Sequence, residues 1–283
     1  MWARLFAALV VALMGGAPGA AQAAWLRGET DKFVVYTDGG ERDLREFIEQ
    51  LGAFDHALRV MHPSTKDNSK AAKFEVYLLR GGNQLRRFKP EAPDNMLGYY
   101  SASPGGVYAV AIRREGPLMK PEQVLFHEYT HRFMLENFPG TAYPAWLIEA
   151  YAEYYGATNV GDAFADVGGG SAARASSLSL RTWIPMETLL GKRVSDLTSN
   201  NDREMFYAQG WLLLHYMMSD ATRRQQLDRA IRRIGAGEEP VQAFLSEVQT
   251  DGPTLSRTLK RYLQGKTNVL RVPKPADLLK DLK

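Results

Sequence analysis

The chain has 283 residues, of which 45% are hydrophobic and 24% are charged, a composition typical of a globular protein rather than of a disordered or fibrous one. Its formal net charge of +3 at pH 7 is too small to indicate binding to nucleic acid or to a membrane surface. The sequence contains no cysteine, which excludes disulfides, thiolate metal ligands and a thiol nucleophile.

Residues 1–23 resemble a secretory signal peptide. Arg4 provides a basic start, an apolar run follows from Leu5 to Met14, and Ala21-Gln22-Ala23 fits the pattern of a cleavage site. An apolar run of about ten residues is too short to span a bilayer, which requires about 20. We therefore expect export to the periplasm or the medium, with a mature chain that begins at Ala24 and is not stably inserted in a membrane.

The part of the chain up to about Ile112 predicts a small sheet combined with helices. Period-two patterns and turn residues indicate the strands, and apolar residues at helical spacing indicate a long helix after the first strand. We expect a strand at 33–36, a helix at 41–61, a strand at 73–79 and a hairpin at 98–112 that turns at Ser103 to Gly106. The second strand of the hairpin, Val107 to Ile112, is either an edge strand on which an extended peptide could lie or an internal strand.

The remainder of the chain predicts an almost entirely helical half. Prolines at first turns and glycines at ends mark the helices. We expect helices at about 121–136, 144–156, 202–219, 220–234, 240–248 and 253–264, a glycine-rich loop at 159–180 and a basic tail at 266–283. The tail is expected either to pack on the domain or to extend from it.

The segment "LFHEYTHRFM" places His127 and His131 four residues apart on a predicted helix, so that both imidazoles can bind one metal ion. Glu128 points about 100 degrees away from His127 around the helix, where it can contact water on the metal without being a ligand. Zinc lowers the pKa of such water to about 7, and a glutamate can take its proton. The motif therefore predicts a catalytic zinc centre with Glu128 as the general base.

A third ligand is expected from the next helix, "PAWLIEAYAEYYG", which contains Glu149 and Glu153 one turn apart. Two antiparallel helices would bring Glu149 opposite the histidine pair, and a His-His-Glu set leaves the fourth zinc position for water. Glu153 lies on the same face, where it could accept the outer N–H of one histidine. The alternative is an exposed helix surface, but the apolar neighbours favour burial of both carboxylates, and buried carboxylates need partners.

These two motifs resemble the gluzincin metallopeptidases, in which H-E-x-x-H is followed by W-L-x-E-G-x-A-x-Y. More narrowly, the chain is similar to the peptidase-MA-like domains of exported bacterial proteins. The segments "KFVVYTDGGERDLREFIEQL", "FEVYLLRGGNQLRRF" and "FYAQGWLLLHYMM" look like that family's pieces in order, so the resemblance covers most of residues 30–265. It implies a zincin-like fold with His127, His131 and Glu149 as Zn²⁺ ligands, Glu128 as the base and Glu153 as the supporting acid.

Two features depart from the pattern of the family. Ala150 stands where the family usually has glycine, although a small residue is retained. The G-x-M-E-N motif of the clan's zinc aminopeptidases, which would bind a free amino terminus, is absent from the sequence. The second departure favours an endopeptidase over an aminopeptidase.

Two residues of "FYAQGWLLLHYMM", Tyr207 and His215, are candidates for stabilising the oxyanion of a tetrahedral intermediate. Residues of these types, on a helix that follows the metal site, do so in related peptidases. The alternative for both is core packing, with the tyrosine hydroxyl bonded to a backbone group.

Other conspicuous residues predict no site. His56 and His62 have no partner at metal-ligand spacing and are expected at the surface or at a helix end. The basic segment "TRRQQLDRAIRR" predicts a solvated helix face, and Gly168 to Gly170 lack the strand and helix context of a phosphate-binding loop.

The sequence thus predicts one α+β gluzincin-like domain, residues 24–265, that hydrolyses peptide bonds of a peptide or protein substrate with Zn²⁺ outside the cytoplasm. Two alternatives remain open. One is a non-catalytic binding or scaffolding module of the cell envelope with the same fold. The other is a zinc hydrolase that cleaves a cell-wall peptide or another amide.

Overall fold

The computed structural model describes residues 25–65, 72–92, 96–103, 106–113, 120–265 and 268–283. The predicted signal peptide lies outside the described residues. Within them, no helix combines the length and the apolar composition that a membrane span requires.

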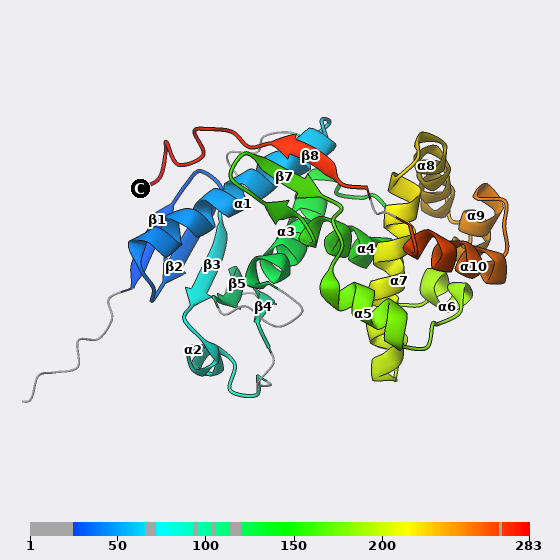
Figure 1. The fold of residues 1–283 in the computed structure, drawn as a ribbon, viewed down its shortest axis with the longest axis horizontal. Coiled ribbons are helices and arrows are strands. Elements are labelled where there is room, and N and C mark those ends of the chain that lie inside the picture. The colour runs from blue at the N-terminus through cyan, green and yellow to red at the C-terminus, as the bar shows by residue number, and fades with distance from the viewer. Residues whose placement is uncertain (1–24, 66–71, 93–95, 104–105, 114–119, 266–267) are drawn as a thin grey trace, which may run out of the picture.

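A five-stranded mixed sheet forms the N-terminal half, which confirms the predicted α+β class (Figure 1). The order is β1-β2-β3-β5-β4, in which β2, β3 and β5 are parallel and the two outer strands are antiparallel to their neighbours. The strands are β1 (Leu26–Glu29), β2 (Phe33–Thr37), β3 (Phe74–Leu79), β4 (Gly98–Ser103) and β5 (Gly106–Ile112). Of the two interpretations of residues 107–112, the internal strand is correct, and β4 is the edge strand on that side.

Helices cover both faces of this sheet. One face packs on α1 (Glu41–Met61) and α3 (Pro121–Asn137), whose apolar stripes join the large hydrophobic core. The other face carries a smaller apolar cluster, which α2 (Gly82–Phe88) covers with Leu85. The helices α1 and α3 begin and end close to their predicted limits, whereas α2 was not predicted because seven residues give too short a pattern to recognise.

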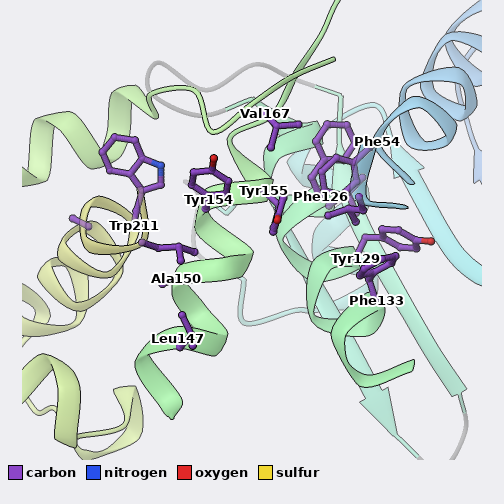
Figure 2. Packing of buried hydrophobic residues seen from close by; sticks show 14 of the residues in the cluster. Phe54, Phe126, Tyr129, Phe133, Leu147, Ala150, Tyr154, Tyr155, Val167 and Trp211 are labelled. Carbon is purple, nitrogen blue, oxygen red and sulfur yellow. The ribbon is translucent and has the colours of Figure 1, made fainter. Parts of the chain in front are cut away.

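The C-terminal half is helical, and α4 (Ala145–Gly156) lies between it and the sheet half. Figure 2 shows the side chains of α4 packing on α3 on one side and on α7 (Asn200–Met218) on the other. Ala150 faces α7, where a Cβ added at Gly210 would lie 3.5 Å from the Cβ of Ala150. After residue 185 follow α6 (Met186–Gly191), α8 (Ala221–Gly235), α9 (Pro240–Glu247) and α10 (Gly252–Leu263). Of these, α6, α8 and α10 pack on α7, and α9 packs on α6 and α8.

The predicted loop at 159–180 is wrong, because most of it is regular structure. The segment contains β6 (Asn159–Val160), β7 (Phe164–Val167) and α5 (Ala172–Leu180). The strands are short, and β7 pairs with β8 (Leu270–Pro273), a partner about a hundred residues later in the chain that no local pattern reveals. The helix α5 is rich in alanine and serine and buries only Arg174, Ser177 and Leu178, so its periodicity is weak.

The C-terminal segment packs on the domain over its described length. From α10 it returns along α1 to the N-terminal half (Figure 1). Arg271 on β8 forms two hydrogen bonds of 2.7 and 2.9 Å with Asp166 on β7. The backbone of Lys283 exchanges two hydrogen bonds of 3.0 and 2.9 Å with that of Glu29. Of the two expectations for the tail, packing on the domain is therefore the correct one.

His62 occupies an aromatic pocket where three helices meet. It caps the end of α1, and its ring lies 5.5 Å from that of Phe138 and 5.5 Å from that of Tyr155, centroid to centroid. The Tyr155 hydroxyl lies 2.9 Å from His62 Nε2. Of the two expectations for His62, the position at a helix end is the correct one. Burial lowers the pKa of His62 from 6.5 to about 4.

This depressed pKa predicts that acid weakens the fold. Between pH 6.5 and about 4 the unfolded chain binds a proton at His62 that the folded chain does not. The contribution of neutral His62 to stability is thus complete above pH 6.5, and up to about 3 kcal/mol is lost as the pH falls to the folded pKa. In urea titrations at pH 7 and 4.5, His62→Gln should lose less stability between the two pH values than the wild type. Equal losses in both proteins would contradict the prediction.

Candidate metal centre

The helix α3 is fixed so that His127 and His131 project away from the sheet. On its opposite side Phe126 and Phe133 are buried in the core, and the hydroxyl of Thr130 donates to the carbonyl of Phe126 at 2.7 Å. Pro121 at the start of the helix suits the first turn, which has no intrahelical partner for a backbone N–H. The two histidines therefore share a face that points toward α4.

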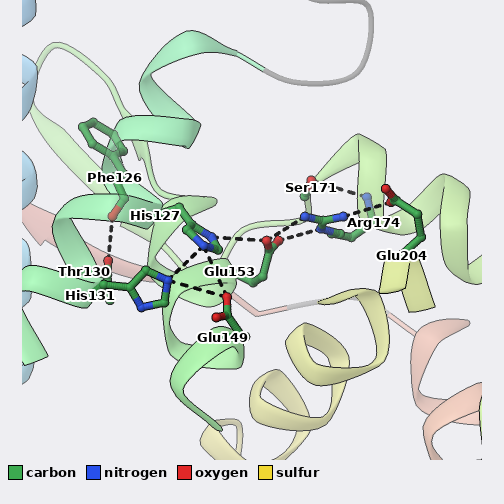
Figure 3. Close-up of polar contacts among 9 residues, drawn as sticks. All are labelled: Phe126, His127, Thr130, His131, Glu149, Glu153, Ser171, Arg174 and Glu204. Carbon is green, nitrogen blue, oxygen red and sulfur yellow. Dashed lines mark hydrogen bonds and ion pairs between the residues drawn. The ribbon is translucent and has the colours of Figure 1, made fainter. Parts of the chain in front are cut away.

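Glu149 on α4 completes a cluster of three potential ligands (Figure 3). Its Oε2 atom lies 3.5 Å from Nε2 of His127 and 3.5 Å from Nε2 of His131, and the two nitrogens are 3.1 Å apart. A tetrahedral zinc ion with ligands at about 2.1 Å separates its ligand atoms by about 3.4 Å. The spacing and the donor types therefore fit one zinc ion.

Glu153 lies behind this cluster, where the sequence placed it. Its Oε1 atom is 3.2 Å from Nδ1 of His127, the nitrogen that faces away from His131 and Glu149. With the proton on Nδ1, the lone pair of Nε2 faces the other two ligands, which is the tautomer that metal binding requires.

The side chains of the cluster strongly influence one another's pKa values. Burial alone would lower the pKa of His127, but the carboxylates of Glu149 and Glu153 raise it to about 10. Burial alone would raise the pKa of Glu149, but His127 and His131 lower it to about 2. These carboxylates therefore favour the protonated form of His127. Because an imidazole nitrogen binds a metal only without its proton, metal binding here is expected to release one.

Glu128 lines a pocket of about 200 Å³ beside His127. The pocket lies between α3 and the C-terminal end of α4, with α5 and α7 contributing to its wall. Its other polar lining residues are Gln123, Glu153, Ser171, Arg174 and Tyr207. Burial raises the pKa of the Glu128 carboxyl. A carboxylate at the wall of a pocket next to a potential metal ligand is suitably placed to accept a proton from water in that pocket.

The structure separates the two oxyanion candidates. The ring of Tyr207 lines the same pocket, with its centroid 6.4 Å from that of His127. His215 is buried elsewhere on α7, where its Nδ1 lies 2.8 Å from the Tyr262 hydroxyl and its Nε2 lies 3.1 Å from the carbonyl of Asn268. Tyr207 is therefore brought to the cluster and His215 is not.

One residue of the site was missed by the sequence analysis. Arg174 on α5 forms hydrogen bonds of 2.6 Å from Nε and from Nη2 to the two oxygens of Glu153. Residues 159–180 were predicted to form a loop, and a loop gave no reason to expect a buried arginine at position 174. A buried glutamate needs a cationic partner, but the sequence does not identify which of its many arginines this is.

No protein-family model matches the chain, and no curated protein matches it.

Gly156 allows α4 to approach α3 closely at the edge of the cluster. A Cβ at this position would lie 3.2 Å from the Gln123 carbonyl oxygen and 3.2 Å from both Cβ and the backbone nitrogen of His127. Two of these three atoms belong to the backbone of α3, so a larger residue must push the helices apart. This separation would move Glu149 and Glu153 away from the histidines.

We predict that Gly156→Val lowers the free energy of unfolding by about 1–3 kcal/mol, as overpacking generally does, and also weakens zinc binding. Gly161→Val is the matched control, because a Cβ there meets only the Phe164 carbonyl oxygen, at an ordinary 3.6 Å. Thermal unfolding and zinc titration of both variants test the prediction. Zinc affinity in Gly156→Val equal to that of the control would contradict it.

Proposed function

We propose that this protein is an exported zinc-dependent hydrolase of peptide bonds, of the gluzincin type. The main support is the spacing of 3.1 to 3.5 Å among Nε2 of His127, Nε2 of His131 and Oε2 of Glu149. Three protein ligands leave one position of a tetrahedral ion open, as in catalytic rather than structural zinc sites. A Zn²⁺ ion bound there would supply a Lewis acid that polarises a carbonyl and acidifies water.

Glu128 is the proposed general base. It follows the first ligand directly in the chain, and it lines the pocket beside that ligand without belonging to the group of three ligand atoms. In this role its carboxylate accepts a proton from the attacking water and later passes it to the leaving amine.

Tyr207 is the proposed donor to the oxyanion. It lines the pocket together with Glu128. Its hydroxyl can donate a hydrogen bond that stabilises the negative charge developing on the carbonyl oxygen. His215 is not retained in this role, since both of its ring nitrogens have partners in the helical half.

An extended peptide is the proposed substrate. The edge strand β4 packs beside α3, and within the described residues it pairs on one side only, with β5. The free side of such a strand offers backbone groups with which a peptide can pair, so that its scissile bond could reach the adjacent metal centre. Together with the predicted signal peptide, this supports cleavage of proteins or peptides outside the cytoplasm rather than a purely structural role.

The proposal is tested with Glu128→Gln and Glu149→Ala, assayed for bound zinc and for hydrolysis of unfolded proteins and short cell-wall-like peptides. Glu128→Gln should retain one zinc per chain but lose at least about a hundredfold in turnover, because general-base catalysis contributes that much. Glu149→Ala should lose zinc as well, because only two ligands remain.

Full hydrolysis by Glu128→Gln would refute its role as the base. A wild-type protein that binds no zinc would refute the proposal itself and favour a non-catalytic module. Cleavage of the cell-wall-like peptides alone would restrict the substrate to that class.

The different surroundings of Tyr207 and His215 predict different effects of their substitution. Tyr207→Phe should lower turnover by about a hundredfold or more while zinc affinity and the melting temperature change little, because it removes one donor to the oxyanion. His215→Gln should mainly lower the melting temperature, because it disturbs two buried hydrogen bonds. Steady-state kinetics and thermal unfolding distinguish these outcomes. The reverse pattern would exchange the two roles.

A further inference from the structure

Arg174 is a buried arginine in the wall of the pocket that the proposed mechanism leaves without a role. Its side chain is 10% exposed, and its guanidinium connects three helices, since it lies on α5 and contacts Glu153 on α4 and both Glu204 and Tyr207 on α7. A buried guanidinium is costly unless its donors are paired, so these contacts define a specific geometry rather than a loose surface pair.

The contact with Glu153 is bidentate. Nε donates to Oε2 and Nη2 donates to Oε1, both at 2.6 Å, and the same Oε1 lies 3.2 Å from Nδ1 of His127 (Figure 3). Two parallel hydrogen bonds fix the plane of a carboxylate, whereas a single bond leaves it free to rotate. Arg174 thus holds one oxygen of Glu153 in position to accept the N–H of His127.

The contact with Tyr207 is a cation–π interaction. The central carbon of the guanidinium lies 5.1 Å from the centroid of the Tyr207 ring, within the range in which the ring attracts a cation. The ring of Tyr207 is in turn 6.4 Å from that of His127. One guanidinium therefore lies against both the acid behind the first zinc ligand and the proposed oxyanion donor.

We infer that Arg174 is a positioning residue of the centre, which fixes Glu153 against His127 and supports the ring of Tyr207. The inference rests on the proposed function, because it presumes that His127 binds a metal. Lysine cannot replace Arg174 fully, because an ammonium group carries the charge but not the planar pair of donors. A comparison of Arg174→Lys with Arg174→Gln therefore separates the effect of the positive charge from the effect of the planar pair of donors.

Arg271 provides a control with the same types of contact at an exposed site, since its side chain is 59% exposed. Like Arg174, it makes a bidentate pair with a carboxylate, that of Asp166 at 2.7 and 2.9 Å, and its guanidinium carbon lies 5.2 Å from an aromatic centroid, that of Phe164. These contacts join β8 to β7 and include no member of the metal cluster. Loss of Arg271 therefore reports the effect of removing such a pair where no metal ligand is involved.

The experiment measures zinc affinity by competition with a chromophoric chelator, for the wild type, Arg174→Gln, Arg174→Lys and Arg271→Gln, with folding checked by circular dichroism. Arg174→Gln should bind zinc at least about tenfold more weakly, as is usual when a residue that orients a ligand is lost. Arg174→Lys should show a smaller loss, and Arg271→Gln should bind zinc like the wild type.

Wild-type affinity in Arg174→Gln, or a loss no larger than that in Arg271→Gln, would overturn the positioning role while leaving the zinc site intact. If Arg174→Gln does not fold, Arg174→Lys decides, and wild-type affinity in that variant would overturn the role. A wild-type protein without zinc would instead overturn the proposed function, and with it this inference.

The contact with Tyr207 is tested by turnover. Tyr207→Phe should cost less in the background of Arg174→Lys than in the wild type, because a displaced ring no longer presents its hydroxyl correctly. Equal costs in both backgrounds would overturn this part of the inference.

Discussion

The close packing of α3 against α4 is the contact on which the candidate centre depends. The two helices run antiparallel, so Gly156 lies beside Gln123 and His127, and one turn to two turns earlier in α4 the carboxylates of Glu153 and Glu149 meet the histidines. The approach is possible because Gly156 has no side chain at the point of contact. The remaining structure holds this pair from outside, with the sheet and α1 behind α3 and with α7 behind α4.

Two buried carboxylates anchor the helix pair from opposite sides. Tyr129, between the two histidines in the chain, donates from its hydroxyl to Asp55 of α1 at 2.8 Å, and Asp55 also pairs with Lys32 and Arg59. On the other side, Glu153 pairs with Arg174. Breaking a buried pair of this kind typically costs about 3–5 kcal/mol, because a charge is left without a partner. The "HEYTH" segment thus contributes an anchoring residue toward the sheet as well as its histidines toward α4.

The sequence was sufficient for the long helices with a clear local pattern, although it missed short elements such as α2. The apolar spacing of residues 41–61 and the prolines at 121 and 144 correctly predicted α1, α3 and α4, and the spacing of the two motifs predicted that Glu149 and Glu153 meet the histidines. It failed where a partner lies far away in the chain. The strand β7 is recognisable only through its pairing with β8. The place of Arg174 follows only from its contact with the buried Glu153. The aromatic pocket of His62 forms only when three helices pack together. Tyr207 and His215 both suit the oxyanion role by residue type and order, and the packing of α7 brings only Tyr207 to the pocket.

The proposed centre holds one zinc ion among Nε2 of His127, Nε2 of His131 and a carboxylate oxygen of Glu149. Diffraction from crystals of the zinc-loaded protein, recorded on both sides of the zinc absorption edge, tests this directly. We expect a single strong anomalous peak at about 2.0–2.2 Å from each of these three atoms. A peak at another group of residues, or no peak after zinc is supplied, would contradict it.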